Sequence, residues 1–246
     1  MLLAIDVGNT RTKVGLWDGS EWARVDAIES NSEGITALLS TLSATRAICA
    51  SVVPTLNDAV SHALSPLDVY FLTASEDFHG LYSCYRPPDT LGADRFANVL
   101  GVFAQAGLMG GMSVDLGTAT KIDILDEDEC DDLAHLGGCI MPGVATSANA
   151  LTSGTSLLPP LDLAAPKFII GNSTMESLRS GVVLAHACAI DEWIRRVRED
   201  GVGGGSVFVT GGFSDLIAPL CRTPMIRKPN LTLDGLVEAS RRLGFA

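Results

Sequence analysis

Two segments of the chain place a carboxylate just before a glycine-bearing turn between strand-like runs. In the first segment, an apolar run over residues 2–7 carries Asp6, Gly8 breaks it, and an alternating run follows over residues 12–16. Such a turn gathers backbone N–H groups, hydroxyls and a lysine around one small volume, which suits phosphate oxygens and leaves the carboxylate to hold a cation or its water. An ordinary β-hairpin explains the same pattern, so the segment alone does not decide between the two.

The same pattern returns in the second half of the chain. Residues 114–125 repeat the order of apolar strand, aspartate, glycine, polar turn and second strand, and Asp115 lies 109 residues after Asp6. This separation is about one domain length, so it indicates an internal duplication. The repeat predicts two α/β halves, residues 1–108 and 109–246, that hold a ligand with several phosphates between them.

A third carboxylate stands at the predicted start of a helix. Residues 92–103 follow an irregular segment over residues 82–91 and place Phe96 and Leu100 on one face at helical spacing. Asp94 then falls in the first turn, where backbone N–H groups are unpaired. A stabilising helix-terminal carboxylate and a general base presented at the junction of the halves are both compatible with this place, and spacing alone favours the stabilising role.

Composition excludes several classes of protein. The 246-residue chain is 47% hydrophobic with a formal net charge of −12, and its densest basic group, residues 195–198, is surrounded by acidic residues. Nucleic-acid binding is therefore not expected, because binding to the phosphate backbone depends on concentrated positive charge. The six cysteines are scattered without a Cys-x-x-Cys, which fits a reducing cytoplasm. We expect neither a signal peptide nor a membrane-spanning segment.

The remaining pattern alternates strands and helices, as in a layered α/β fold. Six of the seven residues 126–132 are acidic, but they lack the glycine and spacing of a calcium loop, so a solvated hairpin tip is predicted. Further strands are predicted at residues 21–27, 47–53, 69–72, 135–143 and 206–210, and helices at 31–42, 57–64, 144–151, 173–200 and 232–243.

Two glycine pairs and one helix start remain as weaker candidates. Glycines in 137–143 and at 211–212 follow or bracket strands, where backbone could approach a flat or anionic ligand, although simple turn chemistry accounts for them as well. Ser173 and Glu176 form a capping-box pattern, which leaves Thr174 free to point elsewhere.

Taken together and in this order, the motifs resemble those of the type III pantothenate kinases and their relatives, the Bvg accessory factor proteins. The resemblance spans nearly the whole chain and rests on six segments: Asp6-Val7-Gly8-Asn9-Thr10, Ala50-Ser51-Val52-Val53-Pro54, Gly92-Ala93-Asp94-Arg95, Asp115-Leu116-Gly117-Thr118-Ala119, residues 137–143, and Val209-Thr210-Gly211-Gly212. It implies membership of the acetate and sugar kinase/Hsp70/actin superfamily, with two ribonuclease-H-like domains and ATP in the cleft. The implied activity is ATP-dependent phosphorylation of pantothenate to 4′-phosphopantothenate, the first step of coenzyme A synthesis.

The resemblance also implies roles for individual residues. Asp94 would be the general base, and Asp115 would hold a monovalent cation, potassium or ammonium, besides the magnesium that accompanies ATP. The family is dimeric, with pantothenate bound near the subunit interface, so a homodimer is expected. ATP would contact Asp6, Val7, Gly8, Asn9, Thr10, Arg11, Thr12, Lys13 and Thr118, and pantothenate would contact Tyr85, Gly92, Ala93, Asp94, Arg95 and Thr174.

One position departs from the family pattern. The family usually has a small hydroxyl residue, most often threonine, where this chain has Lys121. A lysine there could meet phosphate oxygens or take the space and charge of the cation, which predicts a weaker monovalent-cation requirement. The change also keeps open a catalytically inactive relative that acts as a binding or regulatory protein, although intact Asp6, Asp94 and Asp115 argue against it. Another small-molecule kinase of the superfamily is a third possibility.

Overall fold

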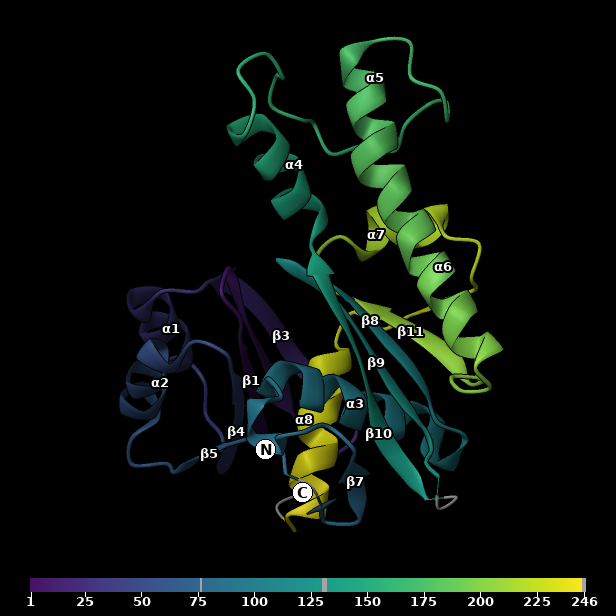
Figure 1. Ribbon diagram of the computed structural model, residues 1–246. Coiled ribbons are helices and arrows are strands. Elements are labelled where there is room, and N and C mark those ends of the chain that lie inside the picture. The colour runs from purple at the N-terminus through teal and green to yellow at the C-terminus, as the bar shows by residue number, and fades with distance from the viewer. Residues whose placement is uncertain (76, 130–131, 245–246) are drawn as a thin grey trace.

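The computed structural model describes residues 1–75, 77–129 and 132–244, and it contains two mixed β-sheets (Figure 1). The first sheet has the order β3-β2-β1-β4-β5. Its strands are β1 (Leu2–Val7), β2 (Arg11–Trp17), β3 (Trp22–Glu29), β4 (Arg46–Ser51) and β5 (Val69–Phe71).

The second sheet has the order β12-β11-β8-β9-β10-β7-β6. Its strands are β6 (Asp77–Phe78), β7 (Leu81–Ser83), β8 (Gly111–Leu116), β9 (Ala119–Glu127), β10 (Leu133–Pro142), β11 (Ser206–Thr210) and β12 (Ile226–Arg227). Five of its strands, in the order β10-β9-β8-β11-β12, correspond one by one to β3-β2-β1-β4-β5 of the first sheet.

Strand directions repeat as well as strand order. In the first sheet, β1 is antiparallel to β2 and parallel to β4. In the second sheet, β8 is antiparallel to β9 and parallel to β11. The internal duplication and the predicted fold of two ribonuclease-H-like units are therefore confirmed.

The helices lie in layers on both sides of each sheet. They are α1 (Ser32–Leu39), α2 (Asn57–Leu64), α3 (Ala93–Ala106), α4 (Val144–Ser153), α5 (Thr174–Arg179), α6 (Ala185–Glu199), α7 (Ser214–Ile217) and α8 (Leu231–Arg242). Apolar residues of α1 and α2 pack on the outer face of the first sheet, and those of α6 and α7 pack on the second sheet. The central layer between the sheets is formed by α3 and α8 (Figure 1).

Two glycines allow α3 and α8 to pack closely. A Cβ atom on Gly235 of α8 would lie 1.7 Å from the carbonyl oxygen of Ala97, and one on Gly101 of α3 would lie 2.4 Å from that of Leu231. Larger side chains would therefore separate these helices. Their apolar faces form the core that joins the two sheets, and Phe96 at its centre is fully buried.

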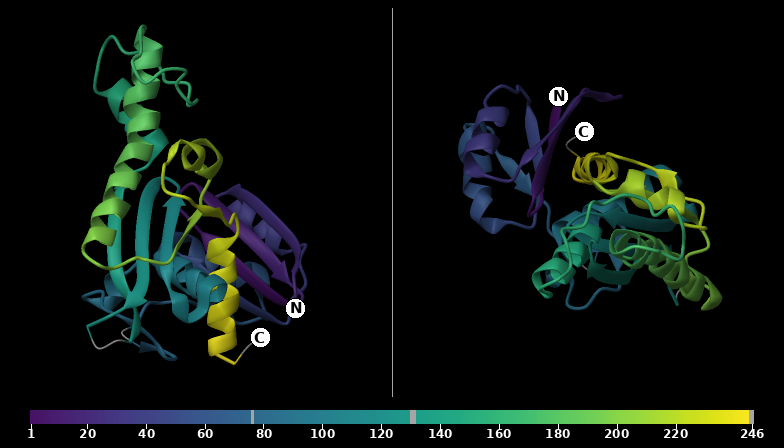
Figure 2. Two further views of the ribbon diagram at one scale, coloured as in Figure 1. Left: turned by 90° about the vertical axis from the view of Figure 1, so that its right-hand side faces the viewer. Right: turned by 90° about the horizontal axis from the view of Figure 1, so that it is seen from above.

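The chain crosses between the sheets at two places. The strands β6 and β7 precede residue 108 but extend the second sheet, by pairing of β7 with β10. The helix α8 follows β12 of the second sheet, yet it also packs against β1 and β4 of the first (Figure 2). Sheet membership thus does not follow the division at residues 108 and 109, and that domain boundary stays a prediction.

Most elements expected from the sequence are present, with two local differences. The segment predicted as a loop over residues 82–91 begins inside β7, a strand of three residues. The predicted helix over residues 173–200 is divided by a π-helical turn, Ser180–Leu184, between α5 and α6. The predicted acidic hairpin tip joins β9 to β10, but residues 130–131 within it lie outside the described part of the chain.

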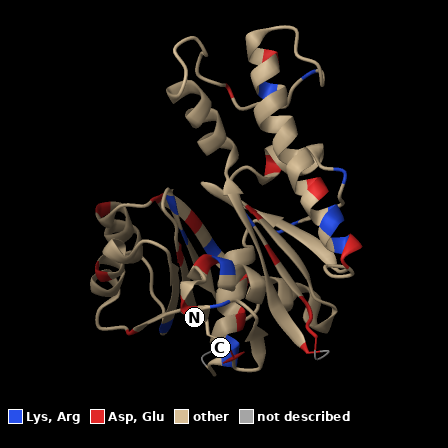
Figure 3. Cartoon of the chain, viewed as in Figure 1, with Lys and Arg blue, Asp and Glu red and all other residues tan. Residues whose placement is uncertain are grey.

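The segment from α4 to the π-helical turn, residues 144–184, projects beyond the second sheet and is called the arm (Figure 1). Its α4 carries no charged residue, and Figure 3 shows charges on the arm mainly near α5 and the preceding loop. Among the described residues, no helix is long and apolar enough to cross a membrane.

Candidate active site

The turns of the two repeated hairpins face each other between the sheets. The hydroxyl oxygens of Thr10, in the β1–β2 turn, and Thr118, in the β8–β9 turn, lie 2.8 Å apart. Asn9 and Arg11 are exposed beside Thr10, and the backbone N–H of Gly8 donates to the carbonyl oxygen of Arg11 at 3.1 Å to close the turn. The two predicted phosphate-binding turns therefore form one continuous polar surface.

Two side chains of the first turn point away from this surface. Val7 is fully buried, and so is Thr12, whose hydroxyl lies 2.9 Å from that of Ser30. The Ser30 hydroxyl donates in turn to the carbonyl oxygen of Gly8 at 2.6 Å. Strand alternation explains this placement. These side chains hold the turn in shape, so Val7 and Thr12 can meet a ligand only through their backbone.

Three charged side chains from three different elements converge beside the turns. The Lys121 ammonium from β9 lies 2.6 Å from Oδ2 of Asp94, on α3, and 2.8 Å from Oδ2 of Asp115, on β8. Each of the three side chains is only about 15% exposed. Burial raises the pKa of Asp115, although Lys121 opposes that shift. Burial alone would lower the pKa of Lys121, but the two carboxylates outweigh it and raise that pKa.

The start of α3 fixes the orientation of the Asp94 carboxylate. Its Oδ1 accepts a hydrogen bond from the backbone N–H of Arg95 at 2.7 Å, while Oδ2 accepts from Lys121. Gly92, at the N-cap, leaves room for the carboxylate, because a Cβ atom there would lie 2.8 Å from Oδ1. Asp94 thus accepts a hydrogen bond from one N–H of the first helical turn and also contacts Lys121 of the second sheet, while its role as general base stays a prediction.

The Asp6 carboxylate at the end of β1 is in a different electrostatic state. Burial raises its pKa to about 7, and the nearby charges of Asp94 and Asp115 add to the shift, while Lys121 and Lys13 oppose it. Among the described residues, no cation forms a direct ion pair with Asp6. Its oxygens are therefore not occupied by a cationic side chain of the described residues.

Arg95, next to the proposed base, is held by a buried hydrogen-bond network. Its Nε and Nη2 donate to the Asp123 carboxylate at 3.1 Å and 2.6 Å, and its Nη1 donates to the Tyr85 hydroxyl at 3.3 Å. Oδ1 of Asp123, which Arg95 contacts, also lies 3.0 Å from Nε2 of His135, and Nδ1 of His135 lies 3.1 Å from the Ser83 hydroxyl. The structure thus brings Tyr85 and Arg95 into contact, and Asp123 anchors Arg95 through Nε and Nη2.

Two glycines pack tightly behind the second turn. A Cβ atom on Gly143 would lie 2.4 Å from the carbonyl oxygen of Gly117, and one on Gly211, with φ of +91°, would lie 2.5 Å from the backbone of Leu116. Both positions therefore exclude a side chain because of protein backbone. By contrast, a Cβ on Gly212 would meet nothing within 4 Å.

Comparison with known proteins identifies the family. A family model described as type III pantothenate kinase matches residues 2–196. Curated type III pantothenate kinases from Thermus thermophilus and Rubrobacter xylanophilus are 35% and 34% identical to this chain, with 97% and 96% of it covered and 98% and 96% of those relatives covered. The chain belongs to the type III pantothenate kinase family.

Solved structures that resemble this family member agree on the fold. A conserved putative Baf family transcriptional activator from Campylobacter jejuni superposes with a TM-score of 0.65 at 19% identity, covering 99% of this chain and 100% of its own. A putative 2-dehydro-3-deoxygalactonokinase from Sinorhizobium meliloti gives 0.60 at 13% identity, with 99% of both chains covered. These similarities support the duplicated α/β fold.

Sequence reasoning missed two side chains of this family member's site. The sequence pattern assigns no role to Asp123, and it places His135 only in a glycine-bracketed strand. A signal for Asp123 existed, because it lies two residues after Lys121 and so shares one face of β9 with it. His135 required the pairing of β9 with β10, whose register shifts between His135 and Gly137.

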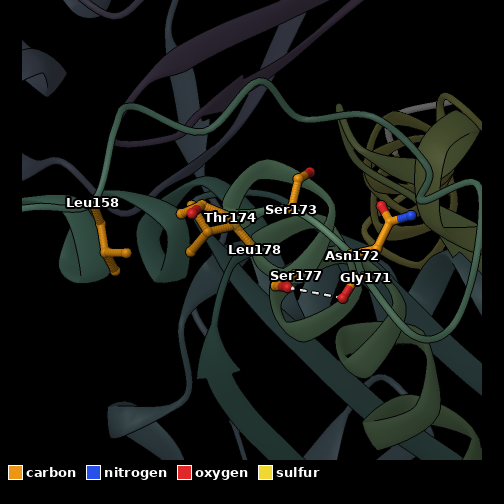
Figure 4. A pocket seen from close by; sticks show the side chains of 7 residues that line it. All are labelled: Leu158, Gly171, Asn172, Ser173, Thr174, Ser177 and Leu178. Carbon is orange, nitrogen blue, oxygen red and sulfur yellow. Dashed lines mark hydrogen bonds between the residues drawn. The ribbon is translucent and has the colours of Figure 1, made fainter.

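One predicted substrate contact lies apart from the rest. Thr174 is the first residue of α5, on the arm, whereas Asp94 and Arg95 lie in the central layer (Figure 1). Thr174 instead lines a shallow pocket of about 580 Å³ together with Leu158, Asn172 and Leu178 (Figure 4). Within one chain of this family member, the structure does not bring Thr174 to the charged cluster.

Proposed function

We propose that this protein transfers the γ-phosphoryl group of ATP to the primary hydroxyl of pantothenate, with Asp94 as general base. The observation that carries the proposal is the position of Asp94, whose partly exposed carboxylate lies beside two opposed turns, joined across Thr10 and Thr118. Phosphoryl transfer requires an aligned acceptor hydroxyl and compensation of phosphate charge more than covalent chemistry. The site offers both within one small volume.

On the nucleotide side, the residues from Asp6 to Lys13 and Thr118 are proposed to bind ATP. Backbone N–H groups of the first turn and the exposed side chains of Asn9, Thr10 and Arg11 supply the polar contacts. Lys13 donates to the carbonyl oxygen of Pro229, so its ammonium is already held at the edge of the site.

A magnesium ion fits this donor set as a partner of ATP. Mg²⁺ commonly binds through one or two carboxylates together with substrate phosphates and water, and it would neutralise phosphate charge during transfer. Asp6 offers an oxygen donor without a direct ion pair among the described residues. In keeping with this, the described residues contain no group of three or more side chains that could hold a metal by itself.

On the acceptor side, Gly92, Ala93, Asp94, Arg95 and Tyr85 are proposed to line the pantothenate site. Asp123 occupies the bidentate edge of Arg95, so the Nη1 edge beside the Tyr85 hydroxyl is the part that can reach the pantothenate carboxylate. Asp94 would orient the hydroxyl and accept its proton, a role that contributes about 10²–10⁴-fold to rate in enzymes.

We also infer that the protein acts as a homodimer in the cytoplasm. Leu157, Phe168, Ile169 and Ile170 on the arm are 93%, 66%, 78% and 85% exposed, which is a large apolar surface for an isolated chain. Association through the arm would cover these side chains, and it gives Thr174 a route to the pantothenate site of the other subunit. The thiols of Cys49, Cys139, Cys188 and Cys221 are free, which fits a reducing compartment.

The decisive experiment is mass-spectrometric detection of 4′-phosphopantothenate formed by the purified protein with ATP, magnesium and pantothenate. The Asp94→Asn variant is the matched control, since it keeps the size of the side chain and its hydrogen bond to Arg95. We expect product from the wild-type protein and a loss of about 10²–10⁴-fold in kcat in the variant. A variant with the wild-type rate would show that the base is wrongly assigned, and ATP turnover only with another alcohol would identify a different substrate.

A further inference from the structure

The Lys121 ammonium contacts Asp115, the residue expected to hold a monovalent cation, and it contacts Asp94 as well. It lies 2.6 Å from Asp94 and 2.8 Å from Asp115, and all three groups are largely withdrawn from water. These are ordinary lengths for charge-assisted N–H···O contacts, so no further ion fits between the two oxygens. The residues present therefore do not fit a potassium or ammonium ion shared by Asp94 and Asp115.

The surrounding charge explains why a cation is needed at this point. Asp6, Asp94 and Asp115 lie close enough for the latter two to raise the pKa of the first. Three carboxylates in one partly buried site repel each other, and they also repel the phosphates of an incoming nucleotide. One fixed positive charge between Asp94 and Asp115 reduces both repulsions.

The covalent attachment of this charge matters. Lys121 lies opposite Asp115 in the β8–β9 pairing, so the hairpin itself aims the side chain at the carboxylate. A free ion must be drawn from solution and loses translational freedom when it binds, whereas a side chain on a strand has lost most of that freedom on folding. Because Lys121 also bonds Oδ2 of Asp94, it acts as a positioning residue for the proposed base.

We infer that Lys121 is a built-in monovalent cation, so that nucleotide binding and catalysis by this protein do not depend on added potassium or ammonium. The inference rests on the proposed function for the role of the site as an ATP site. It goes beyond that function because it assigns to one side chain the task of a dissociable ion.

The test compares wild-type protein with Lys121→Thr and Lys121→Met. Threonine removes the ammonium and leaves a hydroxyl oxygen and open space, whereas methionine removes the charge but keeps most of the volume. Each protein is titrated with potassium chloride at constant ionic strength, with choline chloride as the balancing salt. The readouts are calorimetric binding of the magnesium complex of a non-hydrolysable ATP analogue, and the Tm of each protein.

We expect less than about a twofold change in the wild-type Kd between potassium-free and potassium-rich buffer. Without potassium, Lys121→Thr is expected to bind the analogue about tenfold or more weakly, because two facing carboxylates are left uncompensated. Potassium should restore much of its affinity and raise its Tm. Lys121→Met should stay weak at every potassium concentration, because its side chain fills the space.

Two results would overturn the inference: a wild-type affinity that rises tenfold with potassium, or a Lys121→Thr variant that binds normally without it. If both variants fail to fold, the wild-type titration alone decides the question. The binding assay does not depend on pantothenate. A wild-type protein that forms no 4′-phosphopantothenate yet binds the analogue without potassium would refute the proposed substrate and leave the role of Lys121 intact.

Discussion

The two repeated hairpins share one plan and differ in what their lysines contact. Asp6 is paired in register with Lys13 across β1 and β2, and Asp115 with Lys121 across β8 and β9. Lys121 bridges Asp115 and Asp94, whereas Lys13 donates to the carbonyl oxygen of Pro229, just before α8.

This difference separates two kinds of carboxylate site. Asp6 has no direct ion pair among the described residues and its pKa is raised to about 7, whereas Asp115 is neutralised by its own hairpin. The first hairpin is therefore open to an ion that arrives with the nucleotide, and the second is closed by a charge that belongs to the chain. In both hairpins a lysine is paired with the aspartate across the two strands. The two sites differ because Lys13 and Lys121 contact different partners.

Among the changes that compare the two hairpins, the largest effect is expected from replacing Asp6. Asp6→Asn removes the negative charge and one carboxylate oxygen proposed for magnesium, and it should lower kcat/KM by about 10²-fold or more, as loss of one electrostatic contact in a catalytic site does. Asp115→Asn should lower it less, because Lys121 keeps its contact with Asp94. Steady-state kinetics at saturating magnesium measures both variants. Equal losses would remove the functional distinction between the two hairpins.

A second prediction concerns the position two residues after each lysine. This position is Gly15 in the first hairpin and Asp123 in the second, so only the second can anchor an arginine. Asp123→Asn weakens the hold on Arg95 and should raise KM for pantothenate about tenfold, with a smaller change in kcat, since the loss is a charged hydrogen bond. The control is Glu127→Gln, at the end of the same strand, which should leave both constants unchanged. A fall in kcat at constant KM would contradict this assignment.

The smallest effect expected is on stability against pH. The folded-state pKa of Asp6, about 7, lies above its ordinary value of 3.8, so the folded state binds the proton more tightly. Its contribution to stability is therefore full below about pH 4 and is lost as pH rises through about 7. Replacement of Asp6 by asparagine should reduce the fall in the free energy of unfolding between about pH 4 and pH 7 by roughly 1–3 kcal/mol. Chemical denaturation of ligand-free wild type and Asp6→Asn at several pH values measures it, and parallel curves would contradict it.

Most of the fold could be predicted from local sequence patterns. The spacing of Asp6 and Asp115 before their glycines sufficed to predict both hairpins and the duplication, because turn chemistry and strand alternation are local properties. The strands β6 and β7 were missed because two or three residues give no measurable periodicity. That α8 returns to cover the first sheet is a matter of long-range packing, on which the helix's own sequence pattern gives no information.

The site was predictable in part for the same reason. Lys121 and Asp115 face each other across one hairpin, so their contact follows from local register. The contact of Lys121 with Asp94 depends on how α3 lies against β9, and the contact of Arg95 with Asp123 depends on the same packing. The place of Thr174 depends on the arm, whose direction no residue pattern indicated.

The exchange of segments between the two halves has a consequence for how the molecule unfolds. A fragment that ends at residue 108 would retain β6 and β7 without the strand β10 that they extend, and it would lack α8 over β1 and β4. Neither half is self-sufficient, since each contributes a piece of the other's framework. Melting should therefore occur as a single cooperative transition, in which loss of one half brings about the collapse of the other.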